Sequence, residues 1–254
     1  MTALETLHLI PTVFQPFRNV TAAESTRHGG VSPLPFASLN VGLNTADAPE
    51  NVQENRRRFF ASLAIDPEQV VSSHQVHQDR ILKVTEPGRF EGYDALITNR
   101  PDHFLTVTVA DCTPILIYDA GQKAVAAIHA GWRGTVARIV EKTVAAMQEQ
   151  FGTQPADCYA YVGTCIDLCS FEVGNEVADQ FDKAYKQFDP AQQKFRIDLK
   201  AANVAQLAKA GLPMGQIGIS PYSTVLHNLD FYSYRAGNGT TGRMLAVIGI
   251  RSAE

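Results

Sequence analysis

The sequence predicts a mixed α+β protein in which helices cover layered β-sheets. Short apolar runs that alternate with polar residues, or that are rich in β-branched types, are typical of strands. Segments with helical periodicity lie between these runs. The two kinds of segment do not alternate strictly, and this irregular order favours a layered sandwich over a closed α/β barrel.

Eight segments carry the strand pattern. The expected strands, in chain order, are residues 69–73, 80–84, 104–109, 115–118, 124–128, 158–162, 217–220 and 244–250. The patterns do not predict the order of these strands within a sheet.

The clearest helix pattern begins at Thr135, a suitable N-cap, and ends at Gly152. Between them, apolar residues recur at the helical spacing from Val136 to Met147. Residues 175–188 and 198–210 form two further candidates, the second ended by a Gly-Leu-Pro sequence, and residues 52–63 form a weaker fourth.

Length and composition favour one globular domain over residues 1–254. The chain is 45% hydrophobic, carries a formal charge of -4, and contains no block of like charges. We therefore expect neither a dedicated nucleic-acid partner nor an anionic membrane partner. Residues 1–17 lack a secretory pattern and no run approaches eighteen apolar residues, so we expect a cytoplasmic protein with reduced cysteines.

Two side chains stand at predicted strand ends, where α/β sheets tend to place ligand sites. Cys112 follows the strand 104–109, and His129 follows the strand 124–128, 17 residues later. That separation allows a hairpin-like return that sets the two side by side. A buried structural thiol and a core histidine are the alternative interpretation. His74 and His77, three residues apart, should point to opposite faces of a strand and not chelate together.

Residues 130–136 (AGWRGTV) are typical of a turn that enters a helix. Free backbone N–H groups and the positive end of the helix dipole can hold an anion there, and Arg133 adds a bidentate donor. An ordinary strand-turn-helix joint capped by Thr135 explains the same pattern.

Two other motifs carry no site. Residues 237–242 match G-x-G-x-x-G, but only 12 residues follow, too few for the βαβ unit that this motif requires, so a hairpin turn is expected. Cys165 and Cys169 lack a second pair to complete an all-cysteine zinc site.

Six segments together resemble the bacterial YfiH-like family, also called the polyphenol oxidase family or the laccase-domain purine nucleoside phosphorylases. The segments are residues 26–32 (TRHGGVS), 38–42 (SLNVG), 75–77 (QVH), 110–114 (ADCTP), 129–134 (HAGWRG) and 231–235 (FYSYR). The resemblance implies an α/β/β/α sandwich with mixed sheets, similar to the cytotoxic necrotizing factor deamidase fold.

The resemblance also implies that His77, Cys112 and His129 bind one zinc or copper ion. Two imidazoles and a thiolate that leave a position open for water suit catalytic zinc. The sequence departs from the family at Gln78, Ser170 and 236–238, which puts substrate preference in doubt more than metal binding.

The activities implied are phosphorolysis of adenosine, inosine, guanosine or methylthioadenosine and deamination of adenosine, so the expected partners are a purine nucleoside and phosphate. For deamination, Asp111 can move protons while a zinc-activated water attacks C6, although the H-x-E and P-C-x-x-C signature of nucleobase deaminases is absent. Phosphate needs cationic groups, and either Tyr232 or Tyr234 can stack on the base. The expected substrate-binding residues are Arg27, Gly29, Gly30, Asn40, Arg133, Tyr234 and Arg243.

Other functions fit the same residues. A blue multicopper laccase needs about ten histidines arranged largely as H-x-H pairs, whereas this chain has seven histidines and no such pair. Phenol oxidation at a single copper ion remains an alternative. A second alternative is a metal-free cysteine hydrolase, with Cys112 as nucleophile and His129 as base, acting on an amide in a peptidoglycan precursor.

Overall fold

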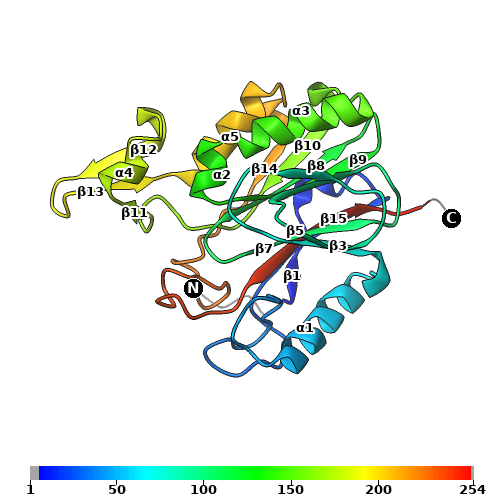
Figure 1. Cartoon of the computed structure of the whole chain (residues 1–254), viewed down its shortest axis with the longest axis horizontal. Helices are drawn as coiled ribbons and strands as arrows, with labels where there is room; N and C mark the ends of the chain where they lie inside the picture. Colours follow the sequence, from blue (N-terminus) through cyan, green and yellow to red (C-terminus); the bar gives the residue numbers. More distant parts are fainter. Residues whose placement is uncertain (1–5, 253–254) are drawn as a thin grey trace.

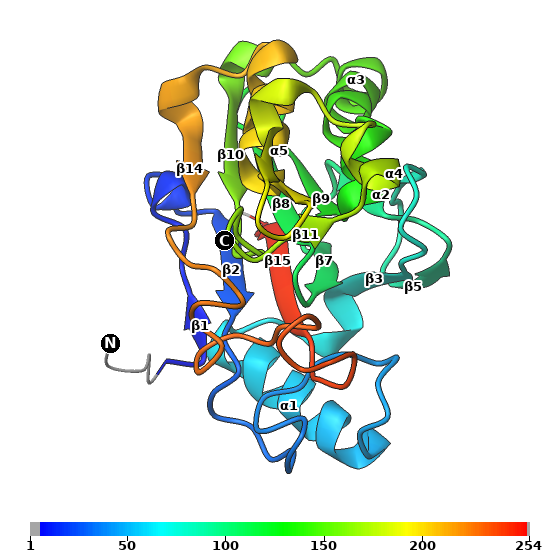
Figure 2. The same ribbon diagram turned by 90° about the vertical axis from the view of Figure 1, so that its left-hand side faces the viewer.

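Two six-stranded mixed sheets lie face to face between two outer layers of helix (Figure 1). The computed structural model describes residues 6–252, so residues 1–5 of the N-terminal segment considered above and residues 253–254 lie outside the description. Figure 2 shows α1 (Pro49–Ser62) against one sheet and α3 (Ile139–Phe151) with α5 (Leu199–Lys209) against the other. The layered α+β fold with mixed sheets is confirmed.

The sheet next to α1 has the order β1-β2-β15-β7-β3-β5. Its strands pair antiparallel from β1 to β7, whereas β3 runs parallel to both of its neighbours. The strands are β1 (His8–Leu9), β2 (Val20–Ser25), β3 (Val70–His74), β5 (Gly88–Glu91), β7 (Phe104–Val109) and β15 (Met244–Ile250).

The sheet next to α3 and α5 has the order β14-β10-β8-β9-β6-β4. The two edge strands run parallel to their neighbours, and the four central strands pair antiparallel. The strands are β4 (Ile81–Lys83), β6 (Ala95–Thr98), β8 (Thr113–Asp119), β9 (Ala124–Ala130), β10 (Cys158–Val162) and β14 (Ile217–Ile219).

The two-residue period of a strand explains why both faces of these sheets are apolar. In β8, Ile115 and Ile117 pack under the helices, while Leu116 and Tyr118 pack between the sheets. In β7, Leu105 faces the space between the sheets, whereas Phe104 packs toward α1. Burial on both faces gives near-continuous apolar runs, which is why these strands are readable from the sequence.

A smaller three-stranded sheet projects from one end of the sandwich (Figure 1). It consists of β11 (Glu172–Val173), β12 (Lys186–Asp189) and β13 (Lys194–Ile197), and the short helix α4 (Asn175–Ala178) packs on it. A short helix, α2 (Trp132–Val136), links β9 to α3.

All eight expected strands are present within two residues of the expected bounds, and the helices expected at 52–63 and 198–210 are confirmed. The Asp198 side chain caps α5 by accepting a hydrogen bond from the Ala201 N–H at 2.9 Å. The pattern missed the short strands whose residues are too few to show a period, and it missed β2.

Three expectations were wrong. The helix expected from Thr135 begins earlier, at Trp132 with Gly131 as its N-cap, so Thr135 is not the cap. It is divided into α2 and α3 because Arg138 adopts φ 59°, a left-handed conformation that ends a helical run. The helix expected over 175–188 ends at Ala178, and residues from Lys186 form β12, paired with β13. Residues 237–242 do not form a hairpin turn, because β14 and β15 belong to different sheets.

Within residues 6–252, no helix is long and apolar enough to cross a membrane.

Candidate functional site

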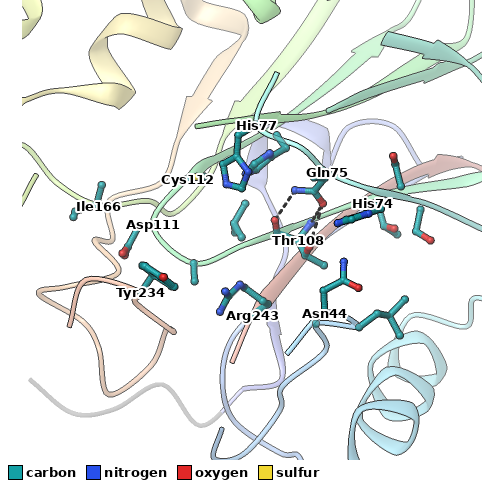
Figure 3. Close-up of a pocket in the computed structure, with 18 of the residues that line it drawn as sticks. Asn44, His74, Gln75, His77, Thr108, Asp111, Cys112, Ile166, Tyr234 and Arg243 are labelled. Carbon is teal, nitrogen blue, oxygen red and sulfur yellow. Dashed lines mark hydrogen bonds between the residues drawn. The ribbon is translucent and has the colours of Figure 1, made fainter. Parts of the chain in front are cut away.

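Three potential metal ligands meet at one end of the sandwich. His77, Cys112 and His129 each offer one ligand atom, and these atoms all lie within 4.8 Å of one another. The two imidazole rings are 4.7 Å apart and nearly perpendicular. Figure 3 shows His77 and Cys112 together above a cavity. The structure therefore brings together the three residues that the resemblance had indicated.

Two of these residues lie on connections that cross between the main sheets. Cys112 lies between β7, in the sheet covered by α1, and β8, in the other sheet. His77 lies between β3 and β4, which also belong to different sheets. Both connections cross at the same end of the sandwich. This topology, rather than a local motif, places the thiol beside the imidazole.

The β8–β9 hairpin brings His129 to the same place. Its register pairs Thr113 with Ala130 and Pro114 with His129, so the expected hairpin-like return from Cys112 to His129 is confirmed. Gly131 leaves room for the cluster. A Cβ atom on Gly131 would lie 3.0 Å from Cys112 Sγ and 3.3 Å from His77 Cδ2.

A fully buried carboxylate, Asp94, holds two parts of the cluster in place. Its Oδ1 accepts a hydrogen bond from His129 Nδ1 at 2.7 Å and another from the His77 backbone N–H at 2.9 Å. Its Oδ2 accepts from the backbone N–H groups of Val76 and Gln78. Because Nδ1 of His129 donates to Asp94, Nε2 is the ring atom left available to bind a metal ion.

Cys112 and the neighbouring imidazoles stabilise each other's charged forms. Burial alone would raise the pKa of the Cys112 thiol, but the neighbouring His129 and His77 imidazoles more than offset burial and lower it to about 6. Burial alone would lower the pKa of His129, yet Cys112 and Asp94 raise it to about 9. The arrangement therefore favours a thiolate at Cys112, the form that binds a metal ion.

Asp111, expected to move protons, lies beside the cluster in a left-handed conformation with φ 88°. Its Oδ1 accepts a hydrogen bond from the Thr224 hydroxyl at 2.5 Å, and its Oδ2 accepts from the Arg235 N–H at 2.7 Å. These bonds tie the β7–β8 connection to the loop after β14. The carboxylate of Asp111 still faces the cavity.

The cluster opens into a cavity of about 610 Å³, a size typical of small-molecule sites. Figure 3 shows Arg243 below the cluster, with Tyr234 and Asp111 on one side and Asn44 and His74 on the other. Two hydrogen bonds of 2.8 Å join the Gln75 side chain to the backbone of Thr108 in the cavity wall, and they connect the segment after β3 to β7.

The structure brings four of the other predicted residues to the cavity wall: Asp111, Arg133, Tyr234 and Arg243. Tyr232 is fully buried, with its hydroxyl donating to the Phe36 carbonyl, so Tyr234 is the tyrosine that faces the cavity. The guanidinium of Arg133 lies 4.3 Å from the ring centroid of Trp132. Helix α2 has only five residues, so the ordinary strand-turn-helix joint describes this segment better than an anion site, with Gly131 rather than Thr135 as the N-cap.

The structure does not bring Arg27, Gly29, Gly30 or Asn40 to the wall of this cavity. Arg27 donates to the carbonyls of Ala37 and Asn228. A Cβ atom on Gly30 would lie 2.1 Å from the Ser38 carbonyl oxygen, so glycine is required there for packing.

Asn40 forms hydrogen bonds to the backbone of two residues that line the cavity. Its Oδ1 accepts hydrogen bonds from the N–H groups of Gly42 and Arg243, at 3.1 and 2.9 Å. It therefore positions the backbone of a cavity residue without facing the cavity itself.

Several residues of the site were not singled out from the sequence. Asp94 has one weak signal, an acidic residue directly before a short apolar run. Arg56 and Arg89 also line the cavity, but nothing in their local sequence distinguishes them from exposed arginines. Cys165 is buried and Cys169 is exposed; both are free thiols outside the cluster.

The fold and this site define a laccase-domain protein of the YfiH-like class. Residues 21–251 match the family described as Multi-copper polyphenol oxidoreductase laccase, and the chain belongs to that family.

Individual relatives are similar to the chain over most of its length. The chain is 37% identical to a purine nucleoside phosphorylase of Bacteroides thetaiotaomicron, covering 92% of this chain and 93% of the relative. It is also 37% identical to purine nucleoside phosphorylase YlmD of Geobacillus stearothermophilus, covering 93% and 92%. The crystal structure of YfiH from Bacillus licheniformis superimposes with a TM-score of 0.91 at 32% identity, covering 98% of both chains.

These relatives support an enzyme, and the His-Cys-His cluster suggests metal binding. Zinc and copper both accept imidazole and thiolate ligands, so the donor set fits either ion. Among the described residues, this is the one group of at least three His, Cys, Asp or Glu side chains that converges closely enough to hold a metal ion.

Proposed function

We propose that this chain is a zinc-dependent purine nucleoside phosphorylase that also deaminates adenosine, with adenosine, inosine, guanosine and methylthioadenosine as substrates. The observation that carries the proposal is the convergence of His77, Cys112 and His129 on a cavity of nucleoside size. The names of the relatives support the substrate class.

His77, Cys112 and His129 would hold the metal ion, with Asp94 behind His129. When bound, the ion supplies Lewis acidity and lowers the pKa of water, which is the chemistry that hydrolytic deamination needs. The protein contributes the thiolate, which the two imidazoles favour, and the fixed orientation of His129.

In phosphorolysis, a phosphate oxygen forms a bond to ribose C1′ while the bond from C1′ to the purine N9 breaks. The purine leaves with the bonding electrons and takes up a proton. The exposed ring of Tyr234 lies at the cavity wall, with the guanidinium of Arg243 5.6 Å from its centroid. This pair provides an aromatic face for the base and a positive charge for phosphate.

In deamination, water adds to the purine C6 and ammonia leaves. Asp111 is the carboxylate that lines the cavity, and it lies on the same short connection as Cys112. Two donors hold it in position, so it can transfer a proton from the attacking water to the leaving amine.

The deciding experiment incubates metal-quantified protein with adenosine, with and without phosphate, and identifies the products. Adenine formed only with phosphate supports phosphorolysis, and inosine formed without phosphate supports deamination. If neither product forms, the proposal is wrong.

The Cys112→Ala variant tests the role of the cluster. It should contain less zinc and lose both activities together, because one of three ligands is removed. Retention of full zinc and full turnover would contradict the assignment of the ligands.

A second candidate function has its own supporting observation. Asp94, His129 and Cys112 have the order of an acid, a base and a nucleophile, as in cysteine hydrolases. A hydrolase of this kind, acting on an amide of a peptidoglycan precursor, requires a free thiolate. Amide cleavage that increases as zinc is removed would favour it, since a zinc-bound thiolate is a poor nucleophile.

Copper at the same cluster is the third candidate, and the family description supports it. A single copper ion at these three ligands would oxidise phenols weakly. Phenol oxidation that rises in proportion to bound copper, with no nucleoside product, would favour this function over the first.

A further inference from the structure

The charged groups of the cavity are strongly unbalanced. Five arginines line its wall, namely Arg56, Arg89, Arg133, Arg235 and Arg243, whereas Asp111 is the one carboxylate among the described lining residues. The whole chain has a formal charge of -4, so this concentration of positive charge is local. Positive groups that line a low-dielectric cleft attract anions.

Three of the arginines, Arg56, Arg89 and Arg243, lie along the part of the cavity that extends from the cluster toward α1. Arg56 is on α1, and Arg89 is on β5. The nearby wall residues Ser72 and Thr106 share the face of Val70 and Phe104, which pack toward α1. Figure 3 shows Arg243 below the cluster and beside Asn44, and Arg89 donates a hydrogen bond to Asn44 Oδ1.

The contacts of Arg56 fix its guanidinium without neutralising it. It donates to the Val41 carbonyl at 3.1 Å and lies 5.2 Å from the ring centroid of Phe60. Within residues 6–252, no carboxylate lies within ion-pairing distance of it. Burial, and secondly the charge of Arg89, lower its pKa to about 10, which indicates that the two cations lie close together. An unpaired cation held in this way is costly unless an anion binds beside it.

Arg89 and Arg243 are held in comparable ways. Arg89 forms its hydrogen bond to Asn44 at 3.1 Å. Among residues 6–252, its one ion-pair partner is the exposed Glu91, 4.0 Å away, which also pairs with His74. Arg243 donates to the carbonyls of Thr241 and Gly242, which are neutral acceptors. A Cβ atom on Gly42 would lie 2.6 Å from Arg243 Cγ, so Gly42 makes room for this side chain.

We propose that Arg56, Arg89 and Arg243 form a phosphoryl-binding subsite at the α1 end of the cavity. Three guanidinium groups on the wall of one cavity supply the positive charge and the paired N–H donors that recognise a phosphoryl dianion. Free inorganic phosphate and the 5′-phosphate of a nucleotide offer the same chemistry. The assignment of inorganic phosphate as the ligand rests on the proposed phosphorylase function, while binding of a phosphoryl group does not.

Equilibrium binding tests the subsite independently of catalysis. Isothermal titration calorimetry of the full chain with inorganic phosphate, and separately with adenosine 5′-monophosphate, should give a dissociation constant that rises about tenfold or more in Arg56→Gln and Arg89→Gln. Arg89 is 45% exposed on an edge strand, so Arg89→Gln should fold even if Arg56→Gln does not.

Two control variants separate the effect of the subsite arginines from that of a neighbouring arginine and from phosphate binding to a metal ion. Arg57→Gln removes a neighbouring arginine on α1 that is 64% exposed and pairs with Glu54, and it should bind phosphate as the wild type does. Cys112→Ala should also retain phosphate binding, which separates the arginine subsite from phosphate bound directly to a metal ion.

Arginine-dependent binding of inorganic phosphate supports the subsite and its role for the co-substrate. Arginine-dependent binding of the nucleotide alone supports the subsite with a nucleotide as its ligand. Binding that is equal in wild type, Arg56→Gln and Arg89→Gln, or no binding of either probe to the wild type, overturns it. Arginine-dependent binding without adenine formation would leave the subsite standing while the phosphorylase function fails.

Discussion

Asp94 Oδ1 and His129 Nδ1 lie 2.7 Å apart in a fully buried hydrogen bond that orients the imidazole toward Cys112. The same two residues are joined a second time, because the His129 N–H donates to the Asp94 carbonyl at 2.7 Å. Burial alone would raise the pKa of Asp94, but its hydrogen bond with His129 and the charge of that ring hold the pKa below its usual range. One carboxylate thus fixes both the ligand ring and the loop that carries His77.

The first prediction concerns this carboxylate. Asp94→Asn should weaken zinc binding by about 10–100-fold, because the amide keeps only one acceptor oxygen. In Asp94, one oxygen accepts from His129 and His77 and the other from Val76 and Gln78. Competition with a chromophoric chelator measures the change. Asp79→Asn alters a nearby carboxylate that pairs with Lys142 at the surface, and it should bind zinc normally. Unchanged zinc affinity in Asp94→Asn would show that Asp94 does not support the site.

The second prediction concerns the space beside the cluster. Gly131→Ala should lower zinc occupancy while the fold is retained, because the added Cβ would lie 3.0 Å from Cys112 Sγ and 3.3 Å from His77 Cδ2. Gly131 has φ -71°, so alanine introduces no backbone strain there. Gly215→Ala is the matched control, since its Cβ meets nothing within 4 Å. Equal zinc content in both variants would refute the prediction.

The third prediction distinguishes the four thiols. In metal-free protein at pH 7, iodoacetamide should modify Cys112 and the exposed Cys169 first, as followed by peptide mass spectrometry. The imidazoles lower the pKa of Cys112 to about 6, whereas burial raises the pKa of Cys158 and Cys165 to about 12 each. Saturating zinc should protect Cys112 and leave Cys169 reactive. Modification of Cys112 at the same rate with and without zinc would argue against its role as a ligand.

The fourth prediction concerns stability at acid pH. Asp47 accepts hydrogen bonds from the Ser32 hydroxyl at 2.6 Å and from the Asn40 amide and Ala48 N–H at 2.9 Å each. Burial alone would raise the pKa of Asp47, but these bonds more than offset it and lower the pKa. The contribution to stability is therefore complete above about pH 4, the ordinary aspartate value, and is lost as the pH falls through the lowered folded pKa.

Urea unfolding between pH 2 and 7 measures this contribution. At neutral pH, Asp47→Asn should lower the free energy of unfolding by about 1–3 kcal/mol. The variant should also lose less stability than the wild type between pH 4 and pH 2. The exposed Glu50→Gln is the control and should follow the wild-type curve. A variant curve parallel to that of the wild type would contradict the prediction.

Parts of the fold could be predicted from local sequence because the interactions that stabilise them, burial of an apolar run or a helix cap, involve residues of the same segment. The apolar run at β15 is buried on both faces, and α5 carries its own cap at Asp198. The failure at residues 175–188 shows the limit of this method. The Asp182 side chain accepts a bond from the Ala184 N–H and starts a separate turn, and the pairing of β12 with β13 then decides the remaining residues.

Some residues of the candidate site could likewise be predicted from local sequence, whereas others could not. Cys112 and His129 were detectable because Cys112 follows β7 and His129 lies near the end of β9, and the hairpin between them has a short, predictable return. His77 was identified by its resemblance to a family motif, since its loop carries no local signal of proximity to Cys112. Asp94 and Arg56 were missed because their partners belong to other elements.

The sequence by itself determined the kinds of element, the donor types available and the family resemblance, because periodicity, caps and motifs act over a few neighbouring residues. Only the tertiary structure decided which groups meet. Two connections cross between the sheets and place His77 beside Cys112, while α1 and β5 direct two arginines into the same cavity. Convergence of this kind depends on how sheets stack, and the stacking energy is shared among core residues distant from the site.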